Sequence, residues 1–456
     1  MAKIDSKEIF EVLPVPKAVK AMALPTIFGQ IIVLIYNMAD TFFVGRTNDP
    51  YMVGATSLIL PVFNISLALA GLTGVGGGAL ISRLLGEGRE DEAKKVSSFS
   101  FYLSIIITGV FSVSMLIFME PILNLLGASE YTFLYAKQYA FCVIVLGGIP
   151  TVLSNVLSNL LRSVGLSKES GFGITMGGII NIALDPLFMF VILPKGSEVL
   201  GVGIATLLSN CIACAYFFAV IIKNRKRTVI GFSIKEGLPE KKSIGAIFNV
   251  GVPSAITALL FDIDYICIDR LMTGYNDVAL AAIGIVLKAE RLPLNVGIGI
   301  CQGMLPIVAY NYAAKNRERM NATIKFSLKL GIIVGIISII LYEIFAGSIM
   351  KVFISDEQTV LLGTGFLKIR CLATPLMFIS FFTVYVFQGF GKGNTSLFLG
   401  VTRWLVFNIP MLFLLNHIFG MYGIVWSQVS ADVLTVILSF LVYFRYERSL
   451  AKQETK

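Results

Sequence analysis

Long apolar segments recur along the whole chain and are separated by short polar stretches. A helix of about 20 apolar residues spans the hydrocarbon core of a bilayer, so this pattern indicates an integral membrane protein. We predict an all-α polytopic membrane protein with 12 transmembrane helices and no large soluble domain. The predicted spans are residues 18–45, 53–82, 96–120, 134–161, 169–194, 201–222, 244–272, 279–311, 323–350, 362–389, 395–418 and 421–444.

The two halves of the sequence resemble each other. The stretch EDEAKKVSSFSFY from Glu90 aligns with RERMNATIKFSLK from Arg317, and Pro25 and Pro253 occupy similar places in spans 1 and 7. Six spans per half is an even number, so a pseudo-twofold axis along the membrane normal is expected to relate two six-helix bundles around a central cleft. The expected domains are an N-terminal bundle (1–222), a cytoplasmic linker (223–243) and a C-terminal bundle (244–456), an organisation that suggests a transporter.

Composition and charge agree with a membrane protein. Of the 456 residues 56% are hydrophobic and only 14% are charged, with a mean hydropathy of +0.82, whereas about 25% of the residues in a soluble domain are charged. The net charge of +9 sits mainly in loops, so nucleic-acid binding is not expected. The odd-numbered loops and their edges carry few of the 37 Lys and Arg residues, namely Arg46, Lys137, Lys195, Arg270 and Lys351. Both termini are therefore expected to be cytoplasmic.

Two acidic residues stand out inside the spans of the N-terminal half. Asp40 precedes Arg46 at the outer end of span 1, and Asp185 precedes Lys195 at the outer end of span 5. A carboxylate at mid-membrane costs about 2.5–3.5 kcal/mol even on lenient scales, so such residues need a reason. Both spans run from inside to outside, which places both acids in the outer half of one bundle. No basic residue in the span interiors of that bundle compensates them.

Polar neighbours accompany these acids at a similar depth. Asn181 lies one turn before Asp185 on the same helix face, Tyr36 lies one turn before Asp40, and Thr206 lies near the outer end of span 6. Like charges held close together in a low dielectric favour a shared proton, and the same oxygens suit Na⁺. The sequence therefore predicts a proton or cation site. The alternative that the two acids only fix packing through hydrogen bonds to hydroxyls stays open.

Several motifs, taken together and in order, resemble the multidrug and toxic compound extrusion (MATE) family. They are P-x14-D in span 1, the LLRSVG end of span 4, NIALDP in span 5 and the GVGIAT opening of span 6. The stretch YNYAAKN at 310–316 further resembles the bacterial MepA-like members. The resemblance covers the whole chain, including the repeat and the twelve spans.

The resemblance implies a function and its residues. It implies a secondary antiporter that exports cationic lipophilic drugs in exchange for H⁺ or Na⁺ by alternating access, and thereby contributes to antibiotic resistance. Such a protein is a monomer in the cytoplasmic (inner) membrane of a prokaryote, needs no cofactor beyond its coupling ion, and has small organic cations and lipid as partners. The coupling-ion residues implied, by analogy with the DinF-like members, are Asp40, Tyr36, Asn181, Asp185, Thr206 and Asn155 of span 4.

Other positions are candidates for a substrate cavity. In the N-terminal half these are Tyr139, Met176 and Met189. In the C-terminal half they are Asp262, Asp264 and Glu290. These acids either form a structural salt-bridge network with Lys288 and Arg291 or take part in substrate or proton handling. The NorM-like branch of the family uses acids in spans 7 and 10, but span 10 here carries Lys368 and Arg370 instead. Arg403 and Asp432 are further members that can pair.

Competing function classes are less well supported. An exporter of lipid-linked sugar precursors from the same superfamily is the alternative function, but a diphosphate needs a basic cavity and the N-terminal bundle interior is acidic. An enzyme is not expected, because a single histidine and six cysteines in apolar segments give neither a nucleophile–base pair nor a metal cluster. No GxxxxGK[ST] phosphate loop is present, so ATP is not the expected energy source.

Overall fold

The computed structural model describes residues 7–454, and this described part is helical without strands. The helices are η1 (Glu8–Val12), α1 (Val15–Gly45), α2 (Pro50–Gly86), α3 (Glu90–Ile117), α4 (Met119–Leu125), α5 (Glu130–Ala140), η2 (Phe141–Leu146), α6 (Gly148–Ser163), α7 (Ser167–Leu187), η3 (Phe188–Ile192), α8 (Glu198–Asn224), η4 (Ile234–Glu236), α9 (Lys241–Thr273), α10 (Asp277–Ala313), α11 (Arg317–Phe353), α12 (Glu357–Cys371), α13 (Thr374–Gly389), α14 (Gly393–Val401), η5 (Thr402–Asn408), α15 (Ile409–Phe419) and α16 (Met421–Glu454).

The described helices form the predicted number of spans. Ten are long and apolar enough to cross a membrane, and two bent pairs bring the total to 12. The bent pairs are Glu130–Leu146 with Gly148–Ser163, at 47°, and Glu357–Cys371 with Thr374–Gly389, at 46°. These pairs are spans 4 and 10, so the repeat seen in the sequence reappears as the same bend at equivalent places.

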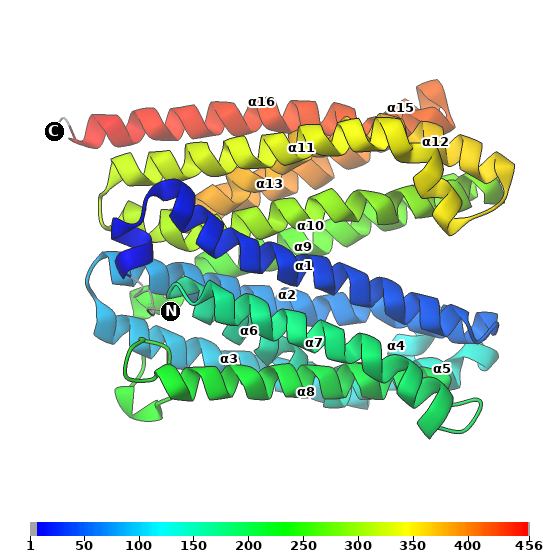
Figure 1. Ribbon diagram of the computed structural model, residues 1–456, viewed down its shortest axis with the longest axis horizontal. Helices are drawn as coiled ribbons and strands as arrows, with labels where there is room; N and C mark the ends of the chain where they lie inside the picture. The colour runs from blue at the N-terminus through cyan, green and yellow to red at the C-terminus, as the bar shows by residue number, and fades with distance from the viewer. Residues whose placement is uncertain (1–6, 455–456) are drawn as a thin grey trace.

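The halves of the chain lie side by side (Figure 1). Helices α3 to α8 lie on one side and α11 to α16 on the other, with α1, α2, α9 and α10 between them. The start of α1, the α8–α9 connection and the end of α16 lie at the same end of the molecule, which we call the inner end. The end of α1 and the end of α7 lie at the opposite, outer end.

Close contacts between the halves lie toward the inner end. A methyl group added at Gly76 of α2 would lie 2.4 Å from the carbonyl oxygen of Ile247 in α9, and one at Gly251 of α9 would lie 1.9 Å from that of Leu72. On α10, a methyl at Gly303 would lie 2.6 Å from Cα of Ala23 in α1. Small residues here let two backbones approach closely, as in other membrane helix pairs. The halves are therefore closed against each other at the inner end.

The short segment η1 closes the inner end further. Arg319, at the start of α11, donates hydrogen bonds to the backbone oxygens of Phe10 (2.5 Å), Leu13 (2.6 Å) and Ile9 (3.0 Å). The Tyr310 hydroxyl donates to the Glu11 carboxylate. The N-terminal segment is thus tied to helices of the C-terminal half.

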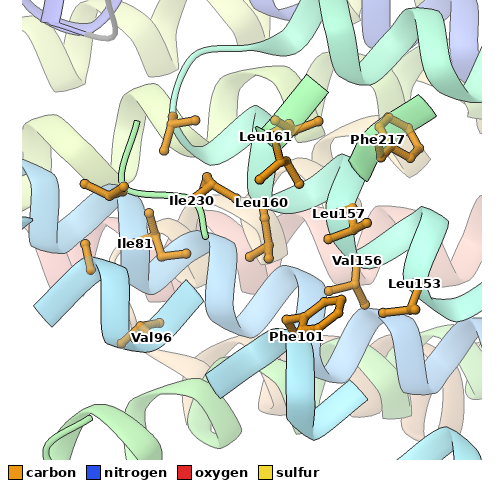
Figure 2. Packing of buried hydrophobic residues seen from close by; sticks show 14 of the residues in the cluster. Ile81, Val96, Phe101, Leu153, Val156, Leu157, Leu160, Leu161, Phe217 and Ile230 are labelled. Atoms are coloured by element: carbon orange, nitrogen blue, oxygen red, sulfur yellow. The ribbon is translucent and has the colours of Figure 1, made fainter. Parts of the chain in front are cut away.

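The core of the N-terminal half lies between α2, α3, α6 and α8 (Figure 2). It includes Ile81, Phe101, Leu157 and Phe217, and its apolar face on α6 follows helical spacing. Ile230 of the connection between the halves also belongs to this core. The connection is therefore packed against the N-terminal half, and its packing fixes the inner ends of α3 and α6.

Candidate functional site

Helices α1 and α7 form a parallel pair that positions the candidate site. Thr26 of α1 and Ser167 of α7 share a hydrogen bond of 3.2 Å near the inner end. A methyl at Gly171 would lie 2.3 Å from the carbonyl oxygen of Pro25, and one at Gly178 would lie 2.5 Å from Cγ2 of Ile32 and 3.1 Å from Cδ1 of Tyr36. Glycines seven residues apart lie on one helix face, so α7 presents one smooth face to α1.

This register brings Asp40 and Asp185 together at the outer end of the pair. Asp185 lies seven residues beyond Gly178 and is therefore on the face that packs against α1. The Asp40 and Asp185 carboxyl groups are within hydrogen-bonding reach of each other. Asp185 is completely buried, whereas Asp40 is half-buried. Two carboxyl groups at this separation require a proton or a cation between them.

Asn181 and Thr206 complete the polar surroundings of Asp185. The Asn181 amide nitrogen donates to the Thr206 hydroxyl at 3.4 Å, which links α7 to α8. The Asn181 side-chain oxygen, both Asp185 oxygens and Asp40 Oδ1 are buried and have no hydrogen-bond donor in the described part of the protein. The site thus offers oxygen acceptors in excess, which is the donor set that H⁺ or a hard cation such as Na⁺ prefers.

Two tyrosines flank the carboxyl pair. Tyr36 lies one turn before Asp40 and packs against α7 at Gly178. Tyr139 of α5 lies within electrostatic range of Asp40, Asp185 and Tyr36, and its ring also packs at Gly203 of α8. The structure therefore brings together six of the predicted residues: Tyr36, Asp40, Tyr139, Asn181, Asp185 and Thr206.

The remaining predicted residues of this half lie apart from the carboxyl pair. Asn155 of α6 donates to the Thr151 backbone oxygen at 2.9 Å, within its own helix. Met189 is buried in a small apolar cluster with Val44 and Val199 at the outer end, and Met176 is half-buried on α7. Nothing in the geometry of these three side chains ties them to Asp40 or Asp185.

The acids of the C-terminal half have partners. Glu290 pairs with Arg370 at 2.9 Å, and Asp432 pairs with Arg403 at 2.8 Å, with all four side chains buried. The Asn408 amide donates to Asp264 at 2.6 Å, and the Asn64 amide donates to Asp262 at 3.0 Å. The last bond connects α2 to α9 and so joins the two halves.

One detail of the predicted salt-bridge network is wrong. Lys288 and Arg291 form no ion pair with Asp262 or Asp264 in the described part of the protein: Lys288 is exposed, and Arg291 lies 5.0 Å over the Tyr265 ring. The partner of Glu290 comes instead from span 10. Residues 290 and 291 are about 100° apart around α10, so only one of them can face the bundle interior. Arg403 and Asp432, which were predicted only as residues that can pair, form an ion pair with each other.

The halves therefore differ in charge balance. In the C-terminal half two buried arginines compensate two of the three buried acids, and the third, Asp264, accepts a hydrogen bond from Asn408, whereas no basic side chain contacts Asp40 or Asp185 among the described residues. Sequence reasoning also missed an interaction between the halves: Gln302 of α10 accepts hydrogen bonds from Gln30 of α1 (3.1 Å) and Arg162 of α6 (3.0 Å). The available signal was two glutamines inside predicted spans 1 and 8 and an arginine directly after predicted span 4.

Comparisons with known proteins agree with this architecture. The MatE family model matches residues 25–187 and 253–414, one match in each half, displaced as the internal repeat predicts. The multidrug export protein MepA of Staphylococcus haemolyticus is 31% identical over 435 residues, covering 95% of this chain and 94% of the relative. MepA of Staphylococcus aureus is 30% identical over 436 residues, covering 95% of each chain.

A solved structure shares the fold. An outward-facing conformation of a multidrug resistance MATE family transporter superimposes with a TM-score of 0.92, at 23% identity, and covers 99% of this chain and 100% of that one. The chain is thus a polytopic membrane transporter and not an enzyme. The chain belongs to the MatE family, the multidrug and toxic compound extrusion transporters, as the resemblance in its motifs predicted.

Proposed function

We propose that this protein exports lipophilic organic cations in exchange for H⁺ or Na⁺, and that the coupling ion binds between Asp40 and Asp185. One observation carries the proposal: two carboxyl groups face each other inside the membrane-spanning region, and no described residue gives them a basic partner. Such an arrangement must take up a proton or a cation to be stable. The names of the relatives, multidrug export proteins, support the substrate class.

The same acids provide the coupling. When both are ionised they attract a cationic drug toward the outer part of the N-terminal half. Binding of a proton or of Na⁺ lowers the negative charge, which weakens the attraction and releases the drug. Ion and drug thus compete for one electrostatic site, and the ion gradient drives the export. Tyr36 and Tyr139 offer aromatic faces beside the acids, which suit an organic cation.

The contacts between the halves fit a transporter open toward the outside. The closest backbone contacts lie toward the inner end, which carries the basic connection between α8 and α9 and is therefore expected to be cytoplasmic. Rocking of the two bundles about the cleft would break these contacts and expose the site inward. The alternative function, export of lipid-linked sugar precursors, is disfavoured because a diphosphate would meet two uncompensated acids.

Transport in liposomes tests the proposal. The purified protein is reconstituted, a pH gradient or a Na⁺ gradient is imposed separately, and ethidium movement is followed. We expect ethidium flux with one gradient, lost in Asp40→Asn and in Asp185→Asn. Asp269→Asn is the matched control, because that carboxylate is exposed near the outer end of α9. Flux that ignores both gradients, or full coupled flux in both site variants, would contradict the proposal.

A further inference from the structure

A buried arginine without an acidic partner lies where the two halves meet. Three arginines of the described chain are more than nine-tenths buried: Arg162, Arg370 and Arg403. Nε of Arg370 lies 2.9 Å from a carboxylate oxygen of Glu290, and Nε of Arg403 lies 2.8 Å from one of Asp432. No carboxylate lies within ion-pair distance of Arg162 in residues 7–454. Buried charges are normally paired, so Arg162 is an exception within its own molecule.

The partners that Arg162 does have are all neutral. Its Nη1 atom donates to the Asn159 oxygen (3.2 Å) and to the Gln302 oxygen (3.0 Å). Its Nη2 atom donates to the hydroxyls of Ser158 (3.3 Å) and Ser170 (3.4 Å). Its Nε atom is buried and has no acceptor among the described residues. The guanidinium is thus held firmly in place while its positive charge remains uncompensated.

A small cavity adjoins this guanidinium. It is lined by Arg162 and Asn159 of α6, Gln302 of α10, Tyr385 of α13, and Gly74 and Gly78 of α2. Its free volume of about 20 Å³ admits one particle of about the size of a water molecule. The lining comes from both halves of the protein, so these groups surround one space only while the inner end is closed.

Polar groups around the cavity can donate hydrogen bonds. Tyr385 is hydrogen-bonded to Gln302 and lies within electrostatic range of Arg162. Asn159 uses one of its two amide hydrogens on the Asn155 backbone oxygen. The Gln302 oxygen already accepts from both Gln30 and Arg162. Uncommitted donors and a positive charge facing a small space are the features of an anion site.

From this geometry we propose that the cavity beside Arg162 binds a single monatomic anion, chloride, when the inner end is closed. The anion compensates the Arg162 charge and is held by Arg162 Nε, Asn159 and Tyr385. The narrow space beside the guanidinium suits a monatomic anion better than acetate or a larger carboxylate. Because the site is made from both halves, bound chloride stabilises the closed inner end and so shifts the transport equilibrium toward the outward-facing state.

Thermal unfolding in purified full-length protein tests the site. A thiol-reactive fluorophore reports unfolding, since Cys142, Cys214, Cys301 and Cys371 are buried. Sodium chloride is compared with sodium gluconate and sodium acetate at equal concentration and pH, which holds Na⁺ and ionic strength constant. We expect chloride alone to raise the midpoint, with a saturable concentration dependence, in the wild type and in the control Arg225→Gln, whose side chain is exposed.

Three variants make the result specific. Arg162→Gln should lose the chloride response, and Tyr385→Phe should raise the half-saturating chloride concentration about tenfold, because a donor to the anion is removed. Gln302→Glu places a carboxylate beside Arg162, so it should be stable in gluconate and indifferent to chloride. This variant decides the matter even if Arg162→Gln does not fold. A wild type that ignores chloride, or a Gln302→Glu protein that responds like the wild type, would overturn the proposal.

Discussion

Asp40 on α1 and Asp185 on α7 bring their carboxyl groups within hydrogen-bonding reach of each other, at the outer end of a helix pair whose contacts run in register from Thr26–Ser167 onward. The pair is parallel and tightly packed, so the two acids cannot move apart without separating the helices. In the proposed function, this fixed geometry preorganises the two carboxyl groups to hold one small cation or a proton.

The first prediction concerns Asp185. Asp185→Asn should reduce gradient-driven ethidium export at least about tenfold, a loss of 1.4 kcal/mol or more in coupling. The same substitution should leave thermal stability unchanged or raise it, because it removes a buried charge at nearly constant volume. Transport in liposomes and unfolding midpoints of the same preparations test both parts. Lower stability in parallel with lower transport would indicate that Asp185 is a packing residue.

The second prediction concerns the spacing of α1 and α7. Gly178→Ala would place a methyl group 2.5 Å from Cγ2 of Ile32, a β-branched side chain that cannot easily turn away. The helices should separate, and transport should fall although both acids remain. Ile32→Ala in the same protein should restore transport by making room. Gly45→Ala is the control on α1, since a methyl there meets no atom within 4 Å.

An unchanged Gly178→Ala protein, or a double variant no better than the single one, would contradict this explanation. In either case the close packing of α1 on α7 would not control the distance between the acids.

Much of the fold and part of the site are predictable from the sequence, for physical reasons. Asp40 and Asp185 are conspicuous because an uncompensated charge in an apolar segment is costly, and their distances from Arg46 and Lys195 give a common depth. The orientation of a long apolar helix about its own axis is not encoded so clearly. The sequence does not show which faces of α10 and α12 meet, so Arg370 could not be assigned to Glu290, although Glu290 is the only acid of predicted span 8 and Arg370 is one of two basic residues of predicted span 10.

Contacts between the two halves are harder still to predict from the sequence. Gln302 meets Arg162 and Gln30 only because the two bundles close at the inner end, and no local pattern reports a contact between helices so far apart in the chain. The glycines at 76, 251, 299 and 303 indicate close helix approach in general. They do not indicate which helix approaches.

The third prediction tests whether the Glu290–Arg370 ion pair of the C-terminal half serves stability or transport. Arg370→Met leaves Glu290 buried without its partner and should destabilise the protein by about 3–5 kcal/mol. Replacing both residues, as Glu290→Gln with Arg370→Met, should recover most of that stability, because no lone charge remains. Thermal unfolding of the single and double variants measures the coupling. Ethidium export by a stable double variant would assign this pair to structure, whereas a stable but inactive double variant would assign it to ion or substrate handling.

The last prediction concerns the N-terminal segment as a clasp on the inner end. Arg319 holds three backbone oxygens of residues 9, 10 and 13, and hydrogen bonds to a charged group contribute about 1.5–3 kcal/mol. Arg319→Ala should therefore release this segment and favour opening at the inner end. Val250→Cys, introduced in a variant without the native cysteines, is a suitable reporter, because Val250 is fully buried between Ala79 and Leu305 of opposite halves. We expect maleimide to label Cys at position 250 about tenfold faster in Arg319→Ala, as a shift of 1.4 kcal/mol would give.

A protein that keeps only Cys301, buried in the core of the C-terminal half, serves as the control for general loosening. Equal acceleration at both positions would mean that Arg319 supports the fold and does not control the inner end, whereas acceleration at position 250 alone would show that the clasp sets how often the two halves part.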